Sequence, residues 1–86
     1  MNNDEMLKKA KKMGALVFKQ NYSDITESDI YIVWFSKTLQ NWKALVSTDK
    51  MIGFYAEITY NGDKHETYID KYVKTENRCI PDVSKK

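Results

Sequence analysis

Few residues of this sequence have the chemistry of an active site, and they are widely spaced. His65 is the single histidine and Cys79 the single cysteine. A thiol and an imidazole act as nucleophile and base only beside an orienting group and an oxyanion site, and a zinc site needs more ligands than these two. A phosphate-binding loop needs closely spaced glycines, whereas the glycines here are Gly14, Gly53 and Gly62. We therefore expect no metal and no cofactor.

Three carboxylates form the other group that could do chemistry. Glu57 precedes Asp63 and Glu66 by a few residues, and such a set could bind Mg²⁺ or act in hydrolysis. The same pattern also suits a solvated sheet face on which Glu57 pairs with a lysine or threonine of a neighbouring strand. The second interpretation is the commoner one, so we expect that the protein is not an enzyme.

Positive charge is concentrated near the N-terminus. Residues 1–22 carry five lysines and two acidic residues, a net charge of +3, while the whole chain carries +2. Lys8, Lys12 and Lys19 fall on one side of a helix and could follow a phosphate backbone, because such contacts require only positive charge. A solvated helix face explains the pattern as well. Nucleic-acid binding through these lysines is therefore the alternative hypothesis.

Aromatic residues make up 13% of the chain, which is high for so small a protein. Most of them must belong to the core, because each ring buries a large apolar area. Binding hot spots favour exposed tyrosine and tryptophan. We predict Tyr31, Trp42 and Tyr55 as exposed anchors for a protein partner.

The N-terminal lysines lie on a predicted amphipathic helix that begins after Asn2 or Asn3 and ends near Asn21. Asparagine caps helices well, and Asp4 and Glu5 suit the positive end of the helix dipole. One stripe of this helix is apolar. We expect its residues to be buried against the later strands, with contacts to Trp34, Val46, Phe54 and Ile58. The stripe comprises Met6, Ala10, Met13, Val17 and Phe18.

Three strands are predicted after a polar loop over 21–29. They cover residues 30–39, 42–48 and 53–60. The first is apolar on both alternating sets, with Trp34 placed beside Ile30 and Ile32. Asn61-Gly62 after the third strand predicts a two-residue type I′ turn.

The segment after this turn supports two interpretations. Residues 64–69 suit a fourth strand, whereas the spacing of Tyr68 and Tyr72 also suits a helix. We predict a short strand to Ile69 followed by a helix over 70–79. Pro81 should end regular structure.

The chain as a whole is predicted to be one α+β domain over residues 1–86, with frayed ends at 1–3 and 81–86. Its architecture is an N-terminal amphipathic helix packed on a three- to four-stranded antiparallel meander, with a short C-terminal helix. One cysteine cannot form an internal disulfide, and no segment has the composition of a secretory signal or a membrane span. We expect a cytoplasmic protein without a membrane partner.

Two blocks of sequence resemble a family of short, uncharacterised proteins from phages and prophages of Gram-positive bacteria. The first block runs from Val33-Trp34 through Lys37-Thr38-Leu39-Gln40-Asn41 to Lys43-Ala44-Leu45 and Ser47-Thr48, and the second contains Thr59-Tyr60-Asn61-Gly62-Asp63-Lys64. The resemblance implies a small accessory protein of the infected or lysogenic cell, which would bind a host or phage protein, with inhibition of that protein as one form of this activity. It assigns no catalytic residue.

Overall fold

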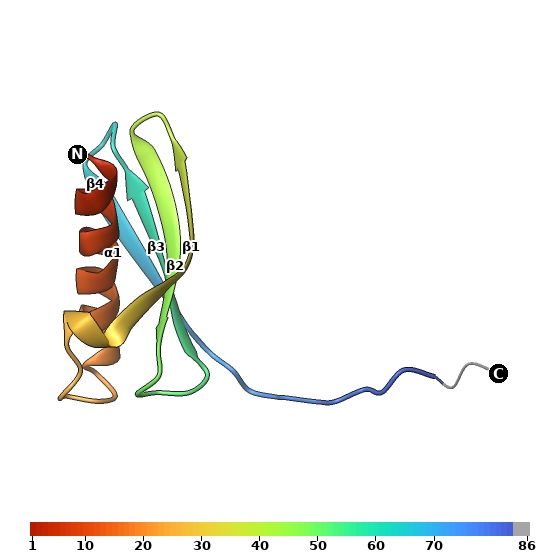
Figure 1. Cartoon of the computed structure of the whole chain (residues 1–86). Coiled ribbons are helices and arrows are strands. Elements are labelled where there is room, and N and C mark those ends of the chain that lie inside the picture. The colour runs from red at the N-terminus through yellow and green to blue at the C-terminus, as the bar shows by residue number, and fades with distance from the viewer. Residues whose placement is uncertain (84–86) are drawn as a thin grey trace.

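The structure, a computed structural model, describes residues 1–83 and has the predicted α+β architecture (Figure 1). A helix precedes a short 3₁₀ helix and a four-stranded antiparallel sheet. The elements are α1 (Asn3–Phe18), η1 (Glu27–Asp29), β1 (Ile30–Thr38), β2 (Asn41–Thr48), β3 (Phe54–Asn61) and β4 (Glu66–Val73). Within residues 1–83, no helix has the length and apolar character that crossing a membrane requires.

Helix α1 starts where the sequence predicts a cap. The Glu5 backbone N–H donates to Asn2 Oδ1 at 2.8 Å, and the Asn2 backbone N–H donates to Glu5 Oε1 at 2.8 Å. This reciprocal pair satisfies donors that a helix start otherwise leaves without partners. The helix ends at Phe18, and turns follow to Asn21.

The sheet is a simple meander in which each strand pairs with the next one in sequence, in the order β1-β2-β3-β4. Helix α1 covers one face of the sheet, and the other face has no covering element among the described residues (Figure 1). This one-sided packing decides which side chains are available to a partner.

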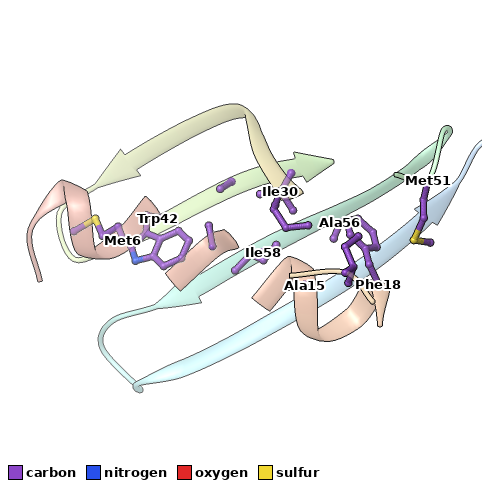
Figure 2. Close-up of a cluster of buried hydrophobic side chains, with 12 residues drawn as sticks. Met6, Ala15, Phe18, Ile30, Trp42, Met51, Ala56 and Ile58 are labelled. Carbon is purple, nitrogen blue, oxygen red and sulfur yellow. The ribbon is translucent and has the colours of Figure 1, made fainter. Parts of the chain in front are cut away.

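The core lies between α1 and the sheet, and Figure 2 shows its side chains. Small residues let the helix approach closely: a Cβ added to Gly14 would lie 2.6 Å from Cγ2 of Val46. The prediction for the helix stripe is largely confirmed, with Met13 and Val17 half-buried rather than fully buried. The buried apolar residues are Met6, Ala10, Ala15, Phe18, Ile25, Ile30, Trp42, Ala44, Val46, Met51, Ala56 and Ile58.

A β-bulge in β1 overturns the predicted position of Trp34. Ile32 pairs with Val46 and Trp34 pairs with Leu45, so Val33 is an extra residue between two consecutive partners of β2. An extra residue reverses the alternation that follows it. Trp34 therefore lies on the face away from α1, and Phe35 takes the inward position.

The predicted C-terminal helix is wrong. Strand β4 continues to Val73, and residues 74–83 have no regular structure. Positions four apart lie on one face of a helix and equally on one face of a strand, so the tyrosine spacing fits both. This segment is a strand and not a helix because it pairs with β3. Tyr72 lies opposite Tyr55, and Val73 lies opposite Phe54. Of the predicted frayed end over 81–86, residues 84–86 lie outside the described residues.

The turn between β3 and β4 is a hairpin, as predicted, but not a two-residue type I′ turn. Asn61 pairs with Glu66, so residues 62–65 form a longer loop, with His65 at φ 54°. The Asn61 side chain accepts hydrogen bonds from the Asp63 and Lys64 backbone N–H groups at 3.0 and 3.2 Å. Gly62 is needed here for space, because a Cβ would lie 2.3 Å from the carbonyl oxygen of Gln40.

The segment before β1 is anchored by a buried side chain and a second cap. Ile25 is fully buried, although the loop around it is polar. Asp29 Oδ2 accepts from the Thr26 backbone N–H at 2.9 Å and from Thr26 Oγ1 at 3.1 Å. The hydrogen bond from the Thr26 backbone is the main cause that lowers the pKa of Asp29 below 3.8.

Candidate functional site

Three rows of side chains cross the sheet on the face opposite α1. They follow from the strand register, because directly paired residues point to the same side. The rows are Tyr31–Ser47–Tyr55–Tyr72, Trp34–Leu45–Glu57–Asp70 and Ser36–Lys43–Thr59–Tyr68. We call this surface the aromatic face, defined by these twelve residues.

Large rings on the aromatic face are open to solvent. Trp34 is 39% exposed and Tyr72 52% exposed, and Tyr31 and Tyr68 are also exposed. A shallow hollow of about 440 Å³ lies between Trp34 and Tyr72. It is lined by Trp34, Leu45, Tyr55, Glu57 and Tyr72. Contiguous exposed apolar surface is uncommon on monomeric proteins and often marks an interaction site.

Two carboxylates lie directly opposite one another in the middle of this surface. Glu57 on β3 pairs in register with Asp70 on β4. Like charges in this position destabilise a sheet. Lys43 approaches Glu57 from the β2 side, with Nζ 4.0 Å from the carboxylate, which agrees with the predicted pairing of Glu57 with a lysine. The three rows therefore carry one lysine against two carboxylates.

Tyr68 extends the aromatic face toward the β3–β4 turn. Its hydroxyl donates to Glu66 Oε1 at 3.0 Å. This hydrogen bond, together with the negative charge of Glu66, raises the pKa of Tyr68 above 10.0. The ring is thus oriented by a neighbour and remains exposed.

The predicted anchors separate into two groups. Tyr31 and Tyr55 lie in one row of the aromatic face, Tyr31 exposed and Tyr55 half-buried. The prediction that Trp42 is exposed is wrong, because it is 3% exposed and belongs to the buried cluster drawn in Figure 2. Its ring stacks on Tyr60, with ring centroids 5.6 Å apart. Within residues 1–83, its buried Nε1 has no hydrogen-bond partner.

Sequence reasoning missed Trp34, Tyr68 and Tyr72 as surface residues. Trp34 was hidden by the bulge, since no sequence pattern marks one residue of an apolar run as the extra one. Tyr68 and Tyr72 alternate with Asp70, and this alternation would have indicated an exposed strand face.

The lysines of the alternative hypothesis lie on the other side of the molecule. Lys8, Lys12 and Lys19 are exposed on or directly after α1. Lys9, between them, is half-buried, and its Nζ lies 4.3 Å from the centroid of the Tyr60 ring. The lysine surface and the aromatic face are thus carried by opposite layers of the fold.

The residues considered for catalysis are not brought together. His65 lies in the β3–β4 turn, with Nδ1 3.4 Å from the Tyr60 hydroxyl, while exposed Cys79 lies in the segment that leaves the far end of β4 (Figure 1). Glu57 lies in the middle of β3, whereas Asp63 lies in the β3–β4 turn. The Asp63 carboxylate accepts a hydrogen bond from the side chain of Gln40, which lies in the β1–β2 turn. Within residues 1–83, no three His, Cys, Asp or Glu side chains are grouped so that they could hold a metal ion.

Comparison with known proteins gives a family but no described relative. No curated protein and no solved structure matches the chain. The model of a family of unknown function (DUF6275) matches residues 4–82, which is nearly the whole chain. The protein therefore belongs to this family of unknown function.

Proposed function

We propose that this protein works by binding another protein through the aromatic face, and that it is not an enzyme. The observation that carries the proposal is the exposure of Trp34 and Tyr72 around a shallow hollow on a sheet face that α1 leaves uncovered. Tyrosine and tryptophan contribute most to binding when a partner removes them from water. The paired strands are also a rigid support for these side chains, so little ordering of the backbone opposes binding.

The resemblance to short phage and prophage proteins supports a biological setting for this activity. An accessory protein of this kind would act in the cytoplasm of the infected or lysogenic cell. Its partner would be a host or phage protein, for example a component of defence or replication that is inhibited by being bound. Proteins of this type need only a binding surface.

The test is affinity capture from lysate of the host cell with paired variants. We expect Trp34→Ala and Tyr72→Ala each to weaken partner binding about thirty-fold, which corresponds to about 2 kcal/mol. The matched control is Leu16→Ala, which removes an exposed apolar side chain from α1. Equal retention of the partner by all three variants would contradict the proposal.

Nucleic-acid binding is the second candidate, favoured by the exposure of Lys8, Lys12 and Lys19. If these lysines neutralise three duplex phosphates, log K should fall with log salt at a slope of about −2.7. Replacing all three by glutamine should then remove most of the slope. The same triple variant should not weaken binding to the protein partner, so one set of proteins separates the two functions.

A further inference from the structure

We propose that the partner inserts an arginine side chain into the hollow of the aromatic face, between its rings and against Glu57 and Asp70. This inference rests on the proposed function, because it names the chemistry of the group that the aromatic face binds. The juxtaposition that carries it is a pair of carboxylates in register on β3 and β4, beside a hollow lined by Trp34, Tyr55 and Tyr72.

The charge of the surface indicates a cation. Glu57 and Asp70 repel each other across the strands, and Lys43 offsets one of them from the β2 side. The Glu57 side chain is only 22% exposed, so water screens it incompletely. A positive group placed between the two carboxylates would relieve this repulsion, whereas an acidic or purely apolar group would not.

The rings indicate an organic cation with a flat shape. Tyrosine and tryptophan attract cations to their faces, and tryptophan does so most strongly. Tyr72 and Tyr55 occupy the row next to Glu57 and Asp70, and Trp34 lies at the other end of the acidic row. A guanidinium group stacks on rings and donates several hydrogen bonds in a fixed plane, so it suits this surface better than the point charge of a lysine.

The remaining surface of the partner should be apolar. Leu45 lines the hollow together with Trp34, and Tyr31 and Val33 on β1 are also exposed. A segment with arginine flanked by apolar residues would match this arrangement. A second copy of the chain matches less well, since its aromatic face presents an excess of carboxylates as well.

The experiment uses phage display: random twelve-residue peptides are selected for binding to the immobilised full chain. We expect binders enriched in arginine that lose at least ten-fold in affinity on Trp34→Ala/Tyr72→Ala. Glu57→Gln/Asp70→Asn should also weaken them at least ten-fold. Asp24→Asn/Glu27→Gln, which removes the same charge from the segment before β1, should change affinity less than two-fold. Citrulline in place of the peptide arginine should reproduce the ten-fold loss, because citrulline keeps the shape without the charge.

The outcomes separate the inference from the function beneath it. Some peptides could need Trp34 and Tyr72 but show no arginine enrichment, or bind the Glu57→Gln/Asp70→Asn variant as well as the wild type. Either result would overturn the arginine site, while the proposed binding function of the aromatic face would stand. Peptides indifferent to Trp34→Ala/Tyr72→Ala overturn the proposed function. A dimer in sedimentation that Trp34→Ala dissociates would make a second copy the occupant and overturn the inference.

A second measurement gives an answer even if the library yields no binder. N-acetyl-arginine amide is titrated into the folded full chain and followed by NMR. We expect it to shift the Trp34 indole and Tyr72 ring signals with a Kd of about 10 mM, as weak cation–π and ionic contacts would give. N-acetyl-citrulline amide should leave these signals in place. An arginine amide that also leaves them in place overturns the inference.

Discussion

The two tryptophans of this small domain have different environments, and their replacement should lower the stability by different amounts. Trp42→Ala should lower the free energy of unfolding by about 3–5 kcal/mol, because it removes a buried ring stacked on Tyr60. Trp34→Ala should cost less, about 1–2 kcal/mol, since Trp34 is 39% exposed. Urea denaturation measures both values. Similar losses for the two variants would place Trp34 in the core and contradict the bulge in β1.

Gly14 illustrates a glycine that is required for space within a helix. Gly→Ala in a helix interior usually stabilises by about 1 kcal/mol. Here the new Cβ would lie 2.6 Å from the stiff, β-branched Val46, so we expect net destabilisation of about 1–3 kcal/mol. Combining Gly14→Ala with Val46→Ala should recover part of the loss. A higher melting temperature for Gly14→Ala would show that α1 packs less closely than described.

Asp29 should make a small part of the stability pH-dependent. Its pKa in the folded protein is lowered, chiefly by the hydrogen bond from the Thr26 backbone, from an ordinary value of 3.8. The stabilisation is therefore present above 3.8 and is lost as the pH falls through the lower folded value. Unfolding followed from pH 6 to pH 2 should show a smaller acid loss for Asp29→Asn than for the wild type. Parallel curves would mean that Thr26 does not stabilise the ionised form.

At the scale of elements, β4 is the segment whose identity matters most for the candidate site. A chain ending at Lys74 should melt within about 2 °C of the full chain, because Lys74 N–H still donates to Gly53 O at 2.8 Å while the described segment after it lies away from the domain (Figure 1).

A chain ending at Asp70 is the matched comparison. It loses the pairs of Lys71, Tyr72 and Val73 with β3, and the bonds from Lys71 Nζ to Gln20 and Asn21 at 3.2 and 2.9 Å. We expect it to melt at least 10 °C lower, which corresponds to roughly 2 kcal/mol in a domain of this size. Equal melting temperatures for the two truncated chains would contradict the pairing of residues 71–73 of β4 with β3.

Most of this architecture was predictable because its signals are local. Asn2 and Glu5 mark the start of α1, and alternation marks β3, so the start of α1 and both ends of β3 are found within about a residue of the prediction. The helix itself ends at Phe18, three residues before the predicted end near Asn21. The failures have physical causes. In β1 both alternating sets are apolar, so a bulge at Val33 leaves no trace. In β4 the four-residue spacing of tyrosines fits two periods at once, and only pairing with β3 distinguishes them.

The candidate site was predicted less well than the fold for a related reason. A surface assembled from four strands depends on register, which the sequence of one strand does not specify. Tyr31 and Tyr55 were identified from residue type alone, and Trp42 was misplaced by the same argument. The opposition of Glu57 and Asp70 appears only when β3 and β4 are aligned.

At the scale of the whole molecule, charge is divided between the two layers of the fold. The lysines of α1 make one layer positive, while the aromatic face carries two carboxylates and Lys43. The lysines of α1 should slow the association of a cationic partner by electrostatic repulsion, although they do not contact the bound partner. We expect Lys8→Gln/Lys12→Gln/Lys19→Gln to raise the association rate of an arginine peptide about two-fold at low salt, with no change at 0.5 M salt. A slower association measured by stopped flow would place the peptide on the lysines.

The strand order has a consequence for how the protein folds. Because each strand pairs only with its neighbours in sequence, no pairing waits for a long loop to close. Each new strand pairs with a strand that is close in sequence, and folding of such local topologies has a low entropic barrier. A chain emerging from the ribosome could therefore dock α1 on the β1–β2 hairpin before β4 has been synthesised, and the aromatic face would be the last surface completed.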